Sequence, residues 1–121
     1  MYRNIKKEII NLIKPINSNV SFDLASEVLM FPHVTCHLGP SYVREGLHSF
    51  LLDVDVWDRS QSTEKVDSLA ELISEKLDRT LINFPGLNIT IWYTGMNSIE
   101  DTDKTIKRKT CSFELQARKD K

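Results

Sequence analysis

The sequence feature that most constrains the fold is a change of hydrophobic period near residue 60. Over residues 48–57 apolar and polar side chains alternate, which is the period of a half-buried strand. Over residues 63–81 apolar side chains recur every three or four positions, as on one face of a helix. That face contains Val66, Leu69, Ala70, Ile73, Leu77 and Leu81. Ser60 or Ser62 is the expected N-cap. The pattern predicts a sheet sealed by a long helix, in which Ile73 is buried.

Three other segments, residues 31–38, 87–93 and 105–117, also predict strands because their apolar side chains alternate with polar ones. Gly39-Pro40 is expected to end the first of them, and the polar residues 95–104 predict a loop before the last. In the last strand the expected inward residues are Cys111, Phe113, Leu115 and Ala117, and the expected outward residues are Ser112, Glu114 and Gln116.

The N-terminal part of the chain predicts a short amphipathic helix followed by a connection. Ile5, Ile9 and Ile13 share one helical face, and Pro15 ends the pattern. Residues 17–30 sustain no period and predict an ordered connection with scattered anchoring hydrophobes.

The predicted elements together give one domain over residues 1–121, a length at which one core is usual. Its predicted class is α+β, a two-layer sandwich. One layer is an antiparallel-rich four-stranded sheet, and the other contains one long helix and a short N-terminal helix.

Overall composition excludes some classes of protein. The 16 Lys and Arg residues nearly balance the 17 Asp and Glu residues, so the chain is not one that coats nucleic acid by bulk charge. No apolar stretch approaches the ~20 residues needed to cross a bilayer, and no signal peptide is recognisable, so we expect a cytoplasmic chain without a membrane partner. Cys36 and Cys111 fall in strand-like apolar contexts and are expected to be buried free thiols.

Positive charge is concentrated at the C-terminal end of the chain. Residues 104–121 contain seven basic and two acidic side chains, which leaves the rest of the chain acidic. Lys104, Lys107, Arg108 and Lys109 are therefore candidates for contact with phosphates, and a solvated loop end is the alternative interpretation.

The sequence offers no complete metal or cofactor site. In an extended strand His33 and His37 would lie about 13 Å apart, with Cys36 on the opposite face, so one metal ion would not bridge them. The four glycines are dispersed and form no phosphate-binding loop. We therefore predict no cofactor and no metal ligand.

Covalent or hydrolytic chemistry has no positive support in the sequence. Asp53 and Asp55 share a strand face, and with Glu114 they suggest a small Mg²⁺-dependent nuclease as an alternative function. A Glu-x-Lys signature on an adjacent strand is missing, and no activated nucleophile motif is present. We therefore predict no catalytic residue.

Residues 50–60, together with the helix that follows them, resemble a known protein family. The segment reads FLLDVDVWDRS and runs through a polar turn into a helix rich in Leu, Ala and Ile. It resembles the tail terminator, or tail-completion, proteins of long-tailed phages. The short N-terminal helix and the segment FPHVT at residues 31–35 agree with that pattern, and the resemblance extends over residues 5–117.

The resemblance implies a non-enzymatic structural protein of the virion tail or neck, assembled in the host cytoplasm. Such a protein forms a homo-oligomeric ring, expected to be hexameric, which caps the tail tube and ends its polymerisation. Its implied partners are the tail tube protein, a head-completion or connector protein, and double-stranded DNA passing through the lumen. A head-closure or neck adaptor protein is the alternative within the same machinery.

The residues suggest which surfaces would serve that role. Leu51, Asp53, Asp55 and Trp57 share the outward face of one predicted strand and combine apolar anchors with charge, as subunit interfaces do. The acidic helix and the basic C-terminal segment suit head-to-tail association into a ring. Lys104, Lys107, Arg108 and Lys109 are candidates for contact with the lumen's DNA or with the tube.

Overall fold

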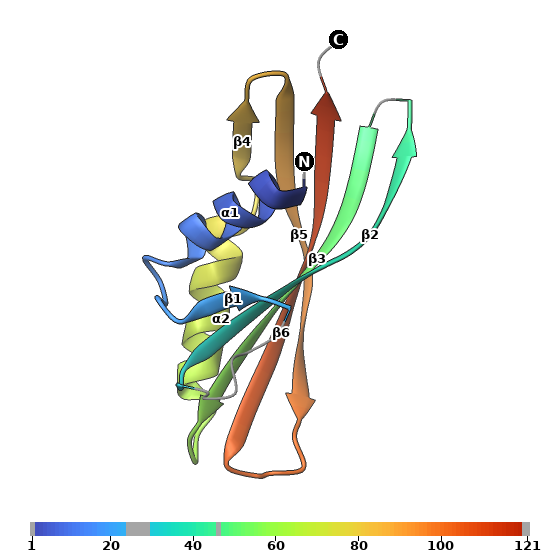
Figure 1. Cartoon of the computed structure of the whole chain (residues 1–121). Coiled ribbons are helices and arrows are strands. Elements are labelled where there is room, and N and C mark those ends of the chain that lie inside the picture. The colour runs from blue at the N-terminus through green and yellow to red at the C-terminus, as the bar shows by residue number, and fades with distance from the viewer. Residues whose placement is uncertain (1, 24–29, 46, 120–121) are drawn as a thin grey trace.

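The structure is a computed structural model that describes residues 2–23, 30–45 and 47–119. Within these residues, two helices pack on one side of a strongly twisted, six-stranded sheet (Figure 1). In chain order the elements are α1 (Tyr2–Ile13), β1 (Val20–Phe22), β2 (His33–Arg44), β3 (Leu47–Arg59), α2 (Glu64–Leu77), β4 (Leu81–Phe84), β5 (Leu87–Glu100) and β6 (Ile106–Lys119).

The strands follow one another across the sheet in the order β1-β2-β3-β6-β5-β4. Strand β1 runs parallel to β2, and every other neighbouring pair is antiparallel. Strands β3 and β6 are therefore central, and their pairing extends from Leu47 opposite Arg118 to Arg59 opposite Ile106.

The core lies between the helices and the inward face of the central strands. On β3 and β6 alternate residues are buried, as the two-residue period predicted, and the same holds for the helical face of α2. Ile73 and the α1 residues Ile5, Ile9 and Ile13 are fully buried. Cys36 and Cys111 are free and buried, which confirms the prediction for both thiols.

The expected four-stranded, antiparallel-rich sheet with one long helix is wrong, because the sheet has six strands and is mixed. Strand β1 lies within the predicted connection 17–30, of which residues 24–29 lie outside the described residues. With three residues it is too short to show a period in the sequence. Its place is fixed by pairing with β2, beginning with Val20 opposite Val34.

Strand β4 was missed because its first residue, Leu81, also fits the helical spacing. Helix α2 ends four residues earlier, at Leu77, because Asp78 is extended and Arg79 adopts a left-handed conformation with φ of 59°. Leu81 consequently points away from the core and is 59% exposed. The predicted N-cap was also wrong, because Thr63 occupies that position and the Ser62 hydroxyl instead accepts a hydrogen bond from the Glu64 N–H.

Strands β2 and β5 both extend beyond their predicted ends. Strand β2 passes through Gly39-Pro40, and its pairing with β3 resumes after a register shift at that point. Strand β5 passes a similar shift next to Gly95 and continues through residues predicted to be a loop. Bulges absorb the irregular residues, and cross-strand backbone hydrogen bonds do not require apolar side chains.

Candidate functional site

The face of the sheet opposite the two helices carries the residues predicted to form a subunit interface. Leu51, Asp53, Asp55 and Trp57 alternate with buried β3 residues, so all four point away from the helices. Leu51 is 56% exposed, and the other three are half-buried. Their common face agrees with the sequence prediction.

Asp55 is held by two residues of β6. The Arg108 Nη2 donates to Asp55 Oδ2 at 2.9 Å, and the Thr110 hydroxyl donates to the other carboxylate oxygen. The Arg108 guanidinium also lies over the Trp57 ring, 4.2 Å from its centroid. The charge of Asp55 is therefore compensated within the chain, and the contact fastens β6 to β3.

Two of the three acidic residues considered for a nuclease, Asp53 and Asp55, are held by different partners. Asp53 accepts a hydrogen bond of 2.8 Å from the Ser112 hydroxyl. Glu114 lies opposite Leu51 in the register, and Asp55 is paired with Arg108. In the part of the chain that the structure describes, no group of three or more His, Cys, Asp or Glu side chains is arranged to hold a metal ion.

The two histidines of β2 also lie apart from one another. In the register His33 is opposite Trp57, and His37 is opposite Asp53. The His37 Nδ1 lies 3.2 Å from an Asp23 carboxylate oxygen. His33 is only 4% exposed, and burial lowers its pKa. Cys36 is fully buried in the core, whereas His33 and His37 occupy the alternate strand positions that face the other side of the sheet.

The basic residues proposed to contact DNA or the tube do not form one patch. Lys109 points toward α2, where its Nζ lies 2.7 Å from Asp67 and lowers the pKa of that carboxyl group. Arg108 points to the opposite face of the sheet, and the Lys107 Nζ donates to the Lys104 carbonyl oxygen. Consecutive residues of a strand alternate between its two faces, so the basic cluster is divided by the sheet.

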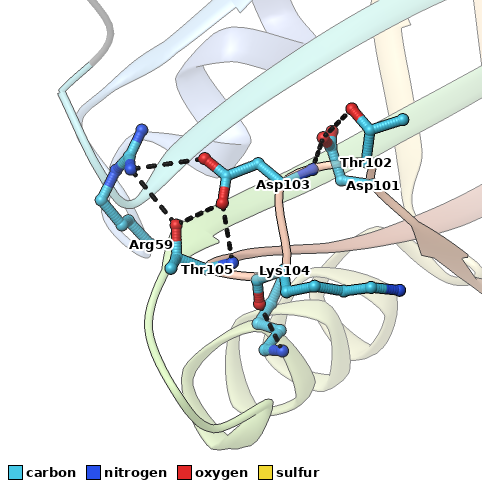
Figure 2. A network of polar contacts seen from close by, with 7 residues as sticks. Arg59, Asp101, Thr102, Asp103, Lys104 and Thr105 are labelled. Atoms are coloured by element: carbon cyan, nitrogen blue, oxygen red, sulfur yellow. Dashed lines mark hydrogen bonds and ion pairs between the residues drawn. The ribbon is translucent and has the colours of Figure 1, made fainter.

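A polar network that the sequence analysis missed fixes the loop between β5 and β6. Figure 2 shows Arg59 reaching from the end of β3 to Asp103, at 3.6 Å, and to the Thr105 hydroxyl, at 3.2 Å. Asp103 in turn accepts hydrogen bonds from the Thr105 N–H and hydroxyl, which lower its pKa. Asp101 accepts from the Asp103 N–H at 3.0 Å. The sequence signal for this network was an alternation of Asp and Thr, which is typical of side-chain-capped turns.

A pocket of about 250 Å³ lies between this loop and the first turn of α2. Its lining combines apolar residues, among them Val66, Ile99 and Ile106, with Lys104 and Lys107. Glu100, Asp101 and Asp67 also line it, so its charge is mixed. The pocket places the two lysines beside an apolar surface at one end of the molecule.

The buried thiols give a direct test of the core. Burial raises the pKa of Cys36 to about 12 and that of Cys111 to about 11. Because the thiolate is the reacting form, we expect both to react at pH 8 at least about 100-fold more slowly with iodoacetamide in the folded protein than in guanidinium chloride. Mass spectrometry of timed samples measures this. Rapid modification of either cysteine in the folded protein would contradict its placement.

In the described part of the chain, no helix has the length and apolar character needed to cross a membrane. No protein-family model matches the sequence, and no curated protein matches it.

The solved structures similar to this one include two that cover most of this chain. One belongs to the virion of a native gene transfer agent particle, with 12% identity and a TM-score of 0.63 over 88% of this chain and 84% of that chain. The other belongs to a protein whose name states no function, with 10% identity and a TM-score of 0.69 over 97% of this chain and 92% of that chain. At these identities the likeness establishes a shared fold.

Proposed function

We propose that this protein is a structural component of a phage-like virion. The observation that carries the proposal is the fold that it shares, over most of both chains, with a chain of the gene transfer agent virion. Within such a particle we propose the role of tail terminator, because residues 50–60 and the following helix resemble that family. The protein would form a ring, expected to be hexameric, that caps the tail tube and ends its growth.

The face of β3 that points away from the helices supports a role in subunit contact. Leu51 exposes an apolar side chain at the centre of the sheet, and Trp57 lies on the same face, four residues along β3 from Asp53. Arg108 already neutralises Asp55, so a neighbour covering this face would bury no unpaired charge at that position. We therefore propose Leu51, Asp53, Asp55 and Trp57 as an interface between copies.

Only two of the four basic residues suggested by the sequence are proposed to contact DNA or the tube. Lys104 and Lys107 form no ion pair with a carboxylate among the described residues, so they are the proposed contacts to lumen DNA or to the tube. Arg108 and Lys109 form ion pairs within the chain, with Asp55 and Asp67.

The proposed protein partners are the tail tube protein and a head connector protein. The proposed location is the neck of the virion, and the proposed role needs no catalysis or cofactor.

Native mass spectrometry and negative-stain imaging test this function. The purified protein, alone and mixed with the tail tube protein of the same particle, is expected to form closed rings and to sit at tube ends. A protein that stays monomeric and never binds tube ends would contradict the proposal. A ring that binds the head connector and ignores the tube would identify a neck adaptor protein instead.

Replacing Leu51 with Lys is expected to weaken assembly about tenfold or more, because interface energy concentrates in buried apolar anchors. The melting temperature should stay within about 3 °C of wild type, since the side chain is exposed in the single copy. Leu81→Lys is the matched control, because Leu81 is similarly exposed but lies on the edge strand β4. Analytical ultracentrifugation measures both variants. Equal effects of the two substitutions on assembly would show that the outward face of β3 is not part of the interface.

A further inference from the structure

Helices α1 and α2 each carry three like charges on the side that faces away from the core. On α1 these are Arg3, Lys7 and Lys14, which we call the basic stripe; Lys14 follows the last helical residue by one position and donates its backbone N–H to Ile10 as a further helical turn would. On α2 they are Glu64, Glu71 and Glu75, which we call the acidic stripe. All six side chains are exposed.

Helix geometry places the members of each stripe in one line. Residues separated by 4, 7 or 11 positions lie within about 40° of one another on a helix of 3.6 residues per turn. The buried residues of α1, such as Ile9, and those of α2, such as Ile73, lie on the opposite sides of their helices. Lys65 and Lys76 are displaced by roughly 100° from the acidic stripe, and Glu8 is displaced further from the basic stripe.

Neither stripe is neutralised within the described part of the chain. The ion pairs that these helices do form use other residues, Lys6 with Asp23 and Asp67 with Lys109. Like charges four residues apart, as in Arg3 with Lys7 and Glu71 with Glu75, destabilise a helix. A surface of opposite charge would relieve that repulsion on both helices.

The two stripes have mirror-image spacing. Counting forward from Arg3, the other two members of the basic stripe, Lys7 and Lys14, lie 4 and 11 positions away. Counting backward from Glu75, the other two members of the acidic stripe, Glu71 and Glu64, also lie 4 and 11 positions away. When the two helices lie side by side and antiparallel, the charges therefore meet in three pairs over about 16 Å of helix, at 1.5 Å per residue. The pairs are Arg3 with Glu75, Lys7 with Glu71, and Lys14 with Glu64.

We propose that α1 of one copy packs antiparallel along α2 of a second copy through these three pairs. The charge complementarity of the two stripes identifies the occupant as another copy of this chain. Leu72, which is 49% exposed beside Glu71, would be partly covered by the contact. Each copy offers α1 to one neighbour and α2 to the other, which is the head-to-tail arrangement that closes into rings. The proposal rests on the ring assembly proposed above and adds the helix layer as one of its contacts.

Reversing one charge in each stripe tests the pairing. Lys7→Glu and Glu71→Lys are each expected to raise the dissociation constant of assembly about tenfold, because each replaces an attraction by a repulsion. Combined in one chain, they should bring it back to within about threefold of wild type. Lys76→Glu is the matched control, because it reverses a charge on α2 outside the acidic stripe and should leave assembly within about threefold of wild type. Sedimentation at low salt measures assembly, and circular dichroism checks the fold of each variant.

The outcomes separate this proposal from the proposed function. If the wild-type protein forms rings and both single reversals assemble as it does, or if the combined variant is no better than the weaker single one, the helix pairing is wrong and the ring role stands. If the wild-type protein is a monomer, both are wrong. If Lys7→Glu loses affinity for duplex DNA while assembly is unchanged, the basic stripe is a polyanion site and the pairing between copies is wrong.

Discussion

Replacing Ile73 with Asp is expected to unfold the protein at 25 °C. Ile73 is fully buried in α2, between the helix and the inward face of the sheet. A carboxylate there would lose its hydration without gaining a partner, and the lost apolar contacts add to that cost. The combined effect of about 5 kcal/mol or more equals the whole stability of many single domains. Loss of the far-ultraviolet circular dichroism signal and of soluble yield would report it.

Leu72→Asp is the matched control for this prediction. Leu72 is the preceding residue of the same helix and is 49% exposed. The same new charge there should move the melting temperature by no more than about 3 °C, because surface substitutions have small effects. A soluble Ile73→Asp variant that melts cooperatively near the wild-type temperature would show that α2 does not seal the core.

The second large effect is expected at Arg108. Replacing Arg108 with Ala removes the ion pair with Asp55 and the cation–π contact with Trp57. The side chains of Arg108 and Asp55 are 27% and 19% exposed, so the pair is intermediate between a surface and a buried ion pair. We expect a loss of about 2 kcal/mol in the free energy of unfolding, measured by urea denaturation.

Two further variants sharpen the result at Arg108. Lys107→Ala, one residue earlier on β6, removes a charge that has no carboxylate partner among the described residues, and it should cost less than about 0.5 kcal/mol. Adding Asp55→Asn to Arg108→Ala should cost about 1 kcal/mol less than the two single changes summed, because the unpaired carboxylate is removed as well. If the Arg108→Ala variant is as stable as the Lys107→Ala variant, Arg108 has no structural role. Arg108 would then again be a candidate for contact with DNA or with the tube.

The sequence predicted the parts of the fold that repeat a pattern. Alternation over β3 and β6 and the helical spacing up to Leu77 identified their buried faces correctly. The sequence did not predict the elements whose bounds depend on strand pairing or on the backbone conformation of a single residue. Strand β1 is too short to show a period, and the end of α2 depends on the left-handed Arg79. Strand β5 remains extended through its polar end because β6 pairs with it.

The candidate site was predicted unevenly for a related reason. The outward face of β3 followed from alternation alone, so Leu51 and its neighbours were placed correctly on one face. The basic cluster was predicted from the consecutive positions of its residues. Consecutive residues of a strand point to opposite faces, however, and this separates Arg108 from Lys109. The partner of Arg108 comes from a strand 53 residues earlier in the chain, which no local pattern reveals.

The interrupted outer strands bear on how copies of this chain can meet without forming fibres. An unpaired strand edge is a template for adding the same strand from another molecule. Here β1 and β4 are three and four residues long. Beyond them, the edges of β2 and β5 that pair with no other described strand are broken by register shifts beside Gly39-Pro40 and Gly95. Proline at position 40 also lacks the N–H that a docking strand would need. Growth by edge-to-edge stacking is therefore disfavoured, which leaves side chains on faces and helices to govern association and favours assemblies of fixed size.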